Sequence, residues 1–191
     1  MGSGTWLEVA AATIRGGADV MQLRDKTASA RQLLDETRQL LPLTRAERIP
    51  LIINDRTDVA RAAGADGVHL GQADLPLHAA RAFLGPHGLI GVSTHTLEQA
   101  LAAEAEGADY IGVGPIFPTP TKPTYPSVGV SLIRQVVSRV RIPMVCIGGI
   151  DRSRVPEVRK AGATCVAVVR AVCAAADPEA ATRELRHLLV Q

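Results

Sequence analysis

One short phrase recurs along this sequence at equivalent places, and it constrains the fold more than any other feature. The phrase is Gly-Ala-Asp or a close variant, and each copy closes a helix-like run and opens a strand-like run. The copies lie at 17–20, 64–67, 107–110 and 162–165. A repeated helix-to-strand junction is typical of a chain built from βα units. We therefore expect one supersecondary unit to be used several times, and we do not expect a solenoid.

The strand-like runs are continuously apolar, as in Leu51–Ile53 and Val166–Val169. Strands that alternate apolar and polar residues have one wet face, whereas continuous apolar strands are buried on both faces. The pattern therefore predicts a parallel sheet covered by helices. The predicted strands are 18–23, 50–54, 66–70, 88–92, 108–113, 142–147 and 163–169.

Helical runs separate the predicted strands, at 5–15, 29–40, 57–63, 75–84, 96–106, 129–139, 153–160 and 178–189. Ser153 and Asp177 are expected at helix starts, and Gly107 and Gly162 at helix ends. Strict alternation predicts an α/β fold of the (β/α)8 TIM-barrel type that lacks its first strand in this chain, because no strand precedes the helix at 5–15. A doubly wound open sheet is the alternative. No linker is visible, so we expect residues 1–191 to form a single (β/α) barrel domain.

Composition excludes several classes of function. Aromatic residues make up 3% of the chain and the net charge is +2, which argues against base stacking and against strong attraction to nucleic acid or membranes. No apolar run approaches the roughly 18 residues that span a bilayer. Cys146, Cys165 and Cys173 form no CxxC motif, and the two in predicted strands are expected to be buried, inert thiols. A reducing, cytoplasmic location fits this usage.

In a barrel of this type the chemistry lies on the loops that follow the strands. Gln22, Arg24 and Lys26 end the first predicted strand and suit an anionic ligand, unless they are only a solvated strand end. Asp55 and Asp74 follow the next two strands. Two carboxylates opposite a cationic cluster are the arrangement expected for Mg²⁺ that carries a diphosphate. Each carboxylate could instead cap the helix that follows it.

Two further loops predict a second anion site. The loop after the strand at 108–113 contains Thr119, Thr121 and Lys122 between prolines, which restrict the backbone and present the lysine. The threonines either offer hydroxyls to a ligand or stabilise the turn. Gly148-Gly149 and Val169-Arg170 end the last two strands, where backbone amides can bind a phosphate. A tight turn without a ligand is the alternative for the glycines.

A general base is not evident. His69 and His95 are the histidines at strand ends; His69 is expected to be a hydrogen-bonded barrel residue, and His95 could cap the helix at Thr96. Neither a Ser/His/Asp nor a Cys/His arrangement is visible. Chemistry driven by departure of a leaving group therefore fits better than proton abstraction.

Together these residues resemble the thiamine phosphate synthase family over about 18–190. The motifs that carry the resemblance are QLRDK, ND, HLGQAD, GVSTHT, GADYIGVGPIFPTPTKP and IGGI, in this order. The resemblance implies a (β/α)8 barrel that joins a hydroxymethylpyrimidine diphosphate to a thiazole phosphate with Mg²⁺. It also implies a dissociative route, in which diphosphate departs before the thiazole nitrogen attacks.

The resemblance assigns a role to each matching residue. Gln22, Arg24, Lys26 and Asn54 would bind the pyrimidine diphosphate, and Asp55 and Asp74 would hold Mg²⁺. Ser93 would contact the pyrimidine, Thr119 and Thr121 the thiazole phosphate, and Lys122 the diphosphate. Gly149, Val169 and Arg170 would bind the phosphate of the thiazole. Arg24, Lys26, Ser93 and Lys122 are the residues expected to act in catalysis.

Two departures from the family pattern are visible. The family begins with a strand before its first helix, and this chain lacks one. The family usually has a serine where this chain has Arg170. We expect phosphate binding to be retained, because the position is used chiefly through its backbone N–H.

Three other functions are compatible with the sequence. A thiazole tautomerase of the same family shares the fold, but it has no diphosphate or Mg²⁺ to hold, so Asn54, Asp55, Asp74 and the TPTK loop favour the synthase. A non-catalytic phosphate-ligand sensor would bind without turnover. A sugar-phosphate isomerase would need a placed base and would leave Lys122 unexplained. The expected partners are small-molecule substrates, and the oligomeric state is open, a homo-oligomer included.

Overall fold

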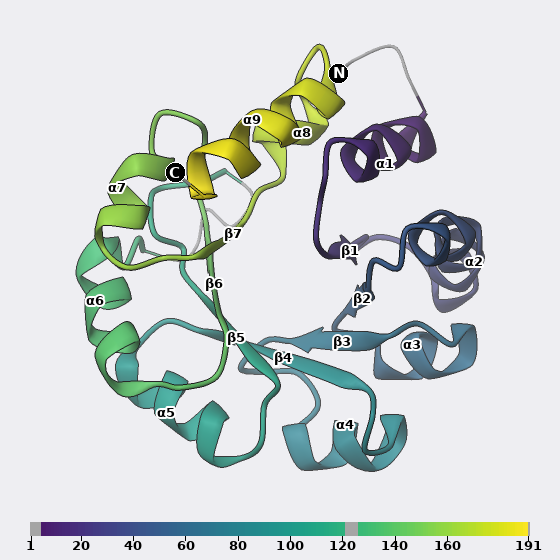
Figure 1. The fold of residues 1–191 in the computed structure, drawn as a ribbon. Helices are drawn as coiled ribbons and strands as arrows, with labels where there is room; N and C mark the ends of the chain where they lie inside the picture. The colour runs from purple at the N-terminus through teal and green to yellow at the C-terminus, as the bar shows by residue number, and fades with distance from the viewer. Residues whose placement is uncertain (1–4, 121–125, 191) are drawn as a thin grey trace.

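The computed structural model describes residues 5–120 and 126–190. Within them the chain alternates helices and strands around a ring (Figure 1). The strands are β1 (Met21–Leu23), β2 (Leu51–Asn54), β3 (Gly67–Leu70), β4 (Leu89–Thr94), β5 (Tyr110–Val113), β6 (Met144–Ile147) and β7 (Cys165–Ala167). The helices are α1 (Trp6–Arg15), α2 (Ala30–Ala46), α3 (Thr57–Ala63), α4 (Leu77–Leu84), α5 (Leu97–Ala105), α6 (Gly129–Arg139), α7 (Val155–Lys160), α8 (Arg170–Cys173) and α9 (Pro178–Val190).

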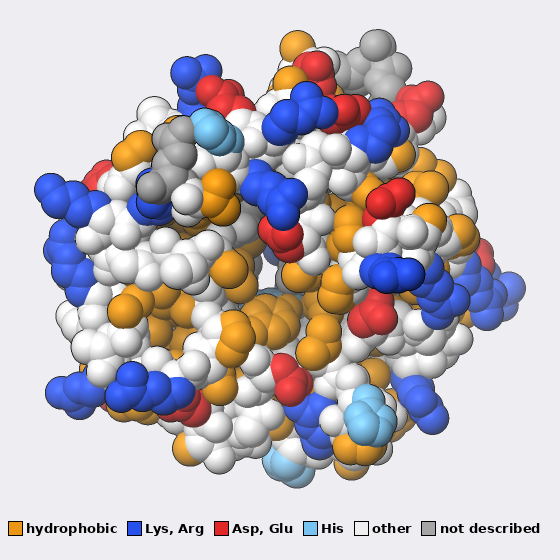
Figure 2. Space-filling view, viewed as in Figure 1, with side chains coloured by type: hydrophobic (Ala, Val, Ile, Leu, Met, Phe, Trp, Pro, Cys, Tyr) orange, Lys and Arg blue, Asp and Glu red, His pale blue; other side chains and the backbone are white. Residues whose placement is uncertain are grey.

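The strands form one parallel sheet in chain order, from β1 to β7. The sheet curls and the helices lie outside it, so the predicted parallel, helix-covered sheet is confirmed (Figure 1). The space-filling surface is hollowed inside the ring, and hydrophobic side chains line the hollow (Figure 2). Because all strands are parallel, their carboxyl ends lie along one edge of the sheet. That edge is where the predicted site residues follow their strands.

One face of the sheet packs against the helices. Leu51, Ile53, Val68, Ile90 and Ile111 are fully or almost fully buried and belong to a single hydrophobic cluster with helix residues. Alternate positions of a strand point to opposite faces, so this cluster uses every second residue of β2 and β3. Burial of each such side chain stabilises the fold by about 1.5–3 kcal/mol.

The opposite, inner face carries polar and small residues near the carboxyl edge. The strand register aligns Asn54 with His69, His69 with Gly91, and Gly91 with Tyr110 in one row. Ser93 lies two residues beyond Gly91 on the same face. Parallel register therefore brings three strands' polar side chains into one place, which sequence spacing alone does not reveal.

The two edge strands, β1 and β7, each have one neighbour in the described sheet. Their side chains are correspondingly less buried: Gln22 of β1 is exposed, and the other β1 residues are half-buried. Cys165 of β7 is exposed as well, which contradicts the expectation of two buried strand thiols. The physical reason is that a strand at a sheet edge lacks the neighbour that would cover it. Cys146, on β6 between two neighbours, is buried as expected, and this burial raises the pKa of its thiol to about 12.

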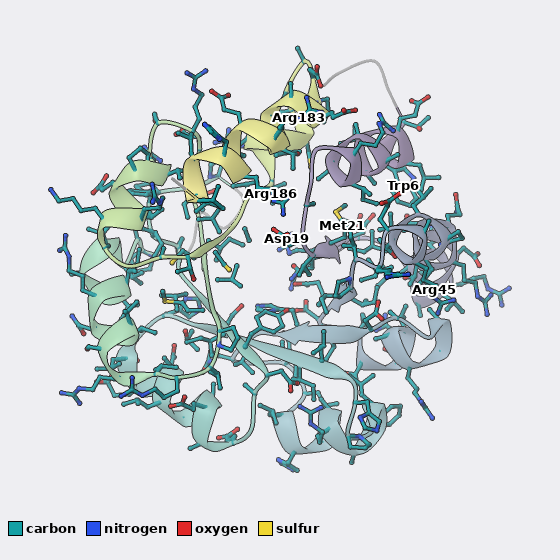
Figure 3. All side chains as sticks on the ribbon, in the orientation of Figure 1. Trp6, Asp19, Met21, Arg45, Arg183 and Arg186 are labelled. Atoms are coloured by element: carbon teal, nitrogen blue, oxygen red, sulfur yellow. The ribbon has the colours of Figure 1, made fainter. Side chains whose placement is uncertain are left out.

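The helix layer is closed where the sheet is not. Helices α1 and α9 pack together so tightly that a Cβ on Gly16 would lie 2.6 Å from the Cβ of Thr182. Arg15 Nε and Glu179 Oε2 are 2.8 Å apart. Arg186 Nη2 lies 3.5 Å from Asp19 Oδ1, and both of these residues are labelled in Figure 3. These contacts join the first and last helical elements of the ring.

Several helix bounds differ from the sequence-based prediction. Helix α2 continues to Ala46 through Pro42, because Leu40, Leu41 and Thr44 are buried on both sides of the proline. Such burial outweighs the roughly 3 kcal/mol that an interior proline costs. Helix α7 begins at Val155 and not at Ser153, and α8 was not predicted because four residues give no periodicity.

In the part of the chain that the structure describes, no helix is long and apolar enough to span a bilayer.

Candidate active site

An acidic pair and a lysine meet at the carboxyl edge of the first three strands. Lys26, after β1, places its Nζ 2.5 Å from Oδ2 of Asp55, which follows β2. The Asp55 carboxyl is in turn hydrogen-bonded to that of Asp74, which follows β3. Three residues that the sequence placed on separate loops thus form one contiguous cluster.

The pKa values of the two carboxyls in this cluster are shifted in opposite directions. Burial pushes the pKa of Asp55 upward, but hydrogen bonds from Lys26 and Asp74 and the charges of Lys26 and Arg24 outweigh it, so the pKa is lowered. Burial, followed by the hydrogen bond to Asp55, raises the pKa of Asp74. Two close carboxyls favour a state in which one is ionised and the other holds a proton. Such a pair is suited to a cation, which offsets the repulsion between the two negative charges.

Neither carboxylate acts as a helix cap. The residue that caps α3 is Arg56, and Asp55 precedes it with φ 61°, a left-handed conformation that is uncommon for residues other than Gly, Asn and Asp. Its N–H donates to the carbonyl of His69, 2.8 Å away. The Asp74 carboxylate accepts from the N–H of Gly71 at 2.6 Å, and the cap of α4 is Pro76. The capping alternatives are therefore wrong for both residues.

Ser93 is buried and hydrogen-bonded on the inner face. Its Oγ lies 2.9 Å from Nε2 of His69, whose Nδ1 lies 3.1 Å from the hydroxyl of Tyr110. Gln72 Nε2 donates to the Ser93 carbonyl at 2.7 Å. The expectation that His69 is a hydrogen-bonded barrel residue is confirmed. His95 does not cap α5: the cap is Thr96, and the His95 ring bonds to the carbonyl of Gly114.

Two glycines make room for these rings. A Cβ on Gly112 would lie 3.0 Å from Cε1 of His69, and one on Gly91 would overlap the ring of Tyr110. The chain therefore needs glycine on β4 and β5 to admit two aromatic rings to the inner face.

The loops after β5 and β6 lie against each other. The N–H of Phe117 donates to the carbonyl of Gly148 at 3.0 Å, and Arg154 Nη1 donates to the Gly149 carbonyl at 2.6 Å. The same guanidinium lies over the Phe117 ring, 4.7 Å from its centroid. Gly149 has φ 64°, and a Cβ there would lie 2.7 Å from the Pro118 carbonyl oxygen. Glycine is thus required for the close approach of the two loops.

The remaining predicted residues occupy separate loops along the same edge. Gln22 is exposed on β1, Arg24 follows it, and Asn54 ends β2. Thr119 follows Pro118, and Val169 and Arg170 follow β7, which is the neighbour of β6. Thr121 and Lys122 lie outside the described residues, and so does the proposed contact of Lys122 with a diphosphate.

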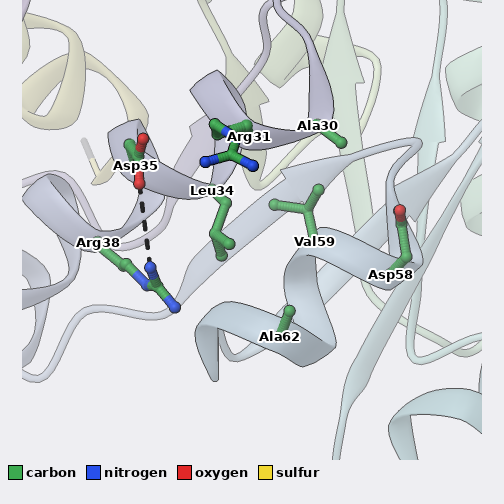
Figure 4. Close-up of a pocket in the computed structure, with 8 residues that line it drawn as sticks. All are labelled: Ala30, Arg31, Leu34, Asp35, Arg38, Asp58, Val59 and Ala62. Carbon is green, nitrogen blue, oxygen red and sulfur yellow. Dashed lines mark ion pairs between the residues drawn. The ribbon is translucent and has the colours of Figure 1, made fainter.

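A surface groove lies elsewhere, between α2 and α3 (Figure 4). Arg31, Leu34 and Val59 line it, and an ion pair of 3.9 Å joins Asp35 to Arg38 beside it. None of the predicted site residues lines this groove. The strand ends, where perturbed carboxyls and convergent polar groups coincide, are the better candidate for an active site.

The oxygen donors at the strand ends are of the kind that Mg²⁺ prefers. No group of three or more His, Cys, Asp or Glu side chains gathers for a metal within residues 5–120 and 126–190. Mg²⁺ commonly takes only one or two protein carboxylates and completes its shell with phosphate oxygens and water. The hydrogen-bonded pair of Asp55 and Asp74 fits that pattern.

Sequence reasoning missed Tyr110 and Gln72. Tyr110 stands in the GADY phrase at the start of a predicted strand, which is a weak signal for a site at the opposite end of the sheet. Its long side chain and the register with His69 bring it there. Gln72 lies within the quoted HLGQAD motif but was given no role.

Comparison with known proteins relates this chain to one family. The sequence matches the family described as "Thiamine monophosphate synthase" over residues 2–172. A thiamine-phosphate synthase from Shouchella clausii is 51% identical over 180 residues, covering 94% of this chain and 86% of the relative. One from Thermosynechococcus vestitus is 50% identical over 185 residues, covering 97% of this chain but 53% of the relative, so the chain spans about half of that protein.

Solved structures agree with the sequence comparison. The thiamine phosphate pyrophosphorylase from Pyrococcus furiosus superimposes with a TM-score of 0.90 at 39% identity, covering 97% of this chain and 90% of that one. A 3-hexulose-6-phosphate synthase superimposes with a TM-score of 0.69 at 22% identity, covering 95% and 92%, and this likeness concerns the fold alone. From its matched residues, its relatives and its fold, this chain belongs to the thiamine monophosphate synthase family.

Proposed function

We propose that this protein is a thiamine phosphate synthase. It would join 4-amino-2-methyl-5-hydroxymethylpyrimidine diphosphate to thiazole phosphate, giving thiamine phosphate and diphosphate. The observation that carries the proposal is the cluster of Lys26, Asp55 and Asp74 at the carboxyl edge, with Ser93 held on the adjoining inner face. We further propose that residues 1–191 are one domain, that the curled sheet is seven eighths of a (β/α)8 barrel, and that the enzyme is cytoplasmic.

The residues at the edge have distinct tasks in this proposal. Asp55 and Asp74 would hold Mg²⁺, which supplies charge neutralisation for a departing diphosphate. Gln22, Arg24 and Asn54 bind the diphosphate end of the substrate. Lys26 exchanges its carboxylate partner for a phosphate oxygen and so stabilises charge that grows on the leaving group. Lys122 has the same task.

A second group of residues positions the other substrate. Thr119, Thr121 and Gly149, with the backbone of Val169 and Arg170, bind the phosphate of the thiazole. Gly149 supports this role because its loop is fixed by Arg154 and lies beside the loop that leads to Thr119. Two anion sites at one edge hold the two reactants in line, and this positioning is the main contribution asked of the protein.

The test is an assay of thiamine phosphate from both substrates and Mg²⁺, with Asp55→Asn beside Asp58→Asn. Asp58 is a matched control, since it is an exposed carboxylate on α3, paired with Arg56 at 2.5 Å. We expect Asp55→Asn to lower kcat/KM at least about a hundredfold and Asp58→Asn to leave it nearly unchanged. Product formation that is independent of Mg²⁺ would contradict the proposal. Binding of thiazole phosphate without product would favour the tautomerase or the sensor.

A further inference from the structure

A hydrogen-bonded chain of three side chains runs across three consecutive strands on the inner face. The Tyr110 hydroxyl of β5 lies 3.1 Å from His69 Nδ1 of β3, and His69 Nε2 lies 2.9 Å from Ser93 Oγ of β4. The rings of His69 and Tyr110 are tilted, with centroids 5.5 Å apart. The chain ends at Ser93, the residue placed against the pyrimidine in the proposed function.

The chain can run in either of two directions, because each ring nitrogen of His69 donates or accepts according to the tautomer. Burial, followed by the charge of Asp109, raises the pKa of the Tyr110 phenol, so the phenol keeps its proton at neutral pH. A phenol that donates to Nδ1 leaves the imidazole proton on Nε2, because a neutral imidazole donates from one nitrogen and accepts at the other. Nε2–H then donates to Ser93 Oγ. The hydroxyl hydrogen of Ser93 is thereby directed away from His69.

Other contacts hold this arrangement in place. Gln72 Nε2 fixes the Ser93 carbonyl at 2.7 Å, and the backbone of Gly91 and Gly112 supplies the space for the two rings. Ser93 is 8% exposed. A hydroxyl that is buried and approached by one donor has a restricted direction in which to offer its own hydrogen.

We propose that Tyr110 is a positioning residue that sets the tautomer of His69 and so turns Ser93 into a hydrogen-bond donor toward a heteroaromatic ring nitrogen. This inference rests on the proposed function for the identity of the ring. The tautomer itself is independent of catalysis, and the two ideas can therefore fail separately.

The first experiment reads the tautomer directly. Long-range proton–nitrogen NMR spectra of the full-length, ¹⁵N-histidine-labelled protein are compared for the wild type and Tyr110→Phe, with His69→Gln to assign the signal. We expect the Nε2–H tautomer in the wild type and a shift toward Nδ1–H in Tyr110→Phe. A wild-type Nδ1–H tautomer, or identical spectra, would overturn the proposal.

The second experiment tests the link to Ser93. Tyr110→Phe is expected to lower kcat about tenfold, while KM for thiazole phosphate and the affinity for inorganic diphosphate with Mg²⁺ stay within about twofold. In the Ser93→Ala background the same change should have no further effect, because the hydroxyl that it positions is gone. A full tenfold loss in that background, or a parallel loss of diphosphate affinity, would show a structural role instead. Thermal unfolding of each variant identifies any that fail to fold.

Discussion

A single residue can show how backbone conformation and chemistry coincide in this protein. Asp55 adopts φ 61°, in the left-handed region that is uncommon for residues other than Gly, Asn and Asp. The conformation turns the chain sharply after β2 and directs the carboxylate to Lys26 and Asp74. Residues held in such conformations concentrate at functional sites. The backbone conformation of Asp55 is therefore consistent with its proposed part in holding Mg²⁺.

Arg170 allows a prediction about a position where this chain departs from its family. It is exposed and begins α8, directly after the turn at Val169. If the position acts through its backbone N–H, Arg170→Ser will leave the affinity for thiazole phosphate within about threefold, or about 0.7 kcal/mol. Isothermal titration of both forms measures this. A gain of more than about tenfold in the serine variant would mean that the arginine side chain crowds the site.

Lys26, Asp55 and Asp74 could be predicted from the sequence because each follows a strand, and parallel strands end at one edge. Tyr110 could not, because its partnership with His69 depends on the register between β3, β4 and β5. The exposure of Cys165 could not be predicted either, since a continuous apolar run has the same sequence pattern in a central strand and in an edge strand.

Among the elements, the entry into α7 shows how a loop near the site is stabilised. Asp151 Oδ1 accepts from the N–H of Ser153 at 2.9 Å, from its hydroxyl at 2.6 Å and from the N–H of Arg154 at 3.2 Å. The Ser153 hydroxyl, with smaller help from neighbouring N–H groups, holds the pKa of Asp151 below its usual value. The ionised carboxylate therefore orders the segment that follows Gly148-Gly149.

Asp151→Ala should reduce the free energy of unfolding by about 0.5–1 kcal/mol at neutral pH, a modest effect because the group is exposed. A carboxyl whose pKa is lowered on folding contributes stability above its unfolded pKa and loses it as pH falls through the folded value. The difference in the free energy of unfolding between variant and wild type should accordingly become smaller at about pH 3. Urea unfolding at both pH values measures it. A deficit that widens on acidification would contradict this account.

The order and type of most elements could be predicted, because apolar runs and glycine junctions mark them. Element ends could not be. β7 stops at Ala167, and Val169 leaves the extended region to begin α8, although the sequence remains apolar. Similarly, Pro42 marks a helix end in sequence, but burial of its neighbours carries α2 past it.

At the scale of the whole molecule, the contact between α1 and α9 closes the ring of helices. Gly16 is central to it: a Cβ there would meet the Glu179 carbonyl oxygen and Thr182 Cβ, each at 2.6 Å. Gly16→Ala should therefore lower the free energy of unfolding by about 1–3 kcal/mol through overpacking. Chemical denaturation provides the measurement. Unchanged stability would mean that the two helices separate readily.

The open pair of sheet edges has a consequence for how ligands act on the protein. Strands β1 and β7 have one neighbour each in the described sheet, so the first cooperative opening of the molecule is expected there and not at β4. Arg24 and Lys26 follow β1 directly. A ligand that binds these two residues and also Asp55, which follows β2, would stabilise the least stable edge of the sheet. Bound substrate would then hold the two strands together, and the free energy of unfolding would increase with occupancy of the site.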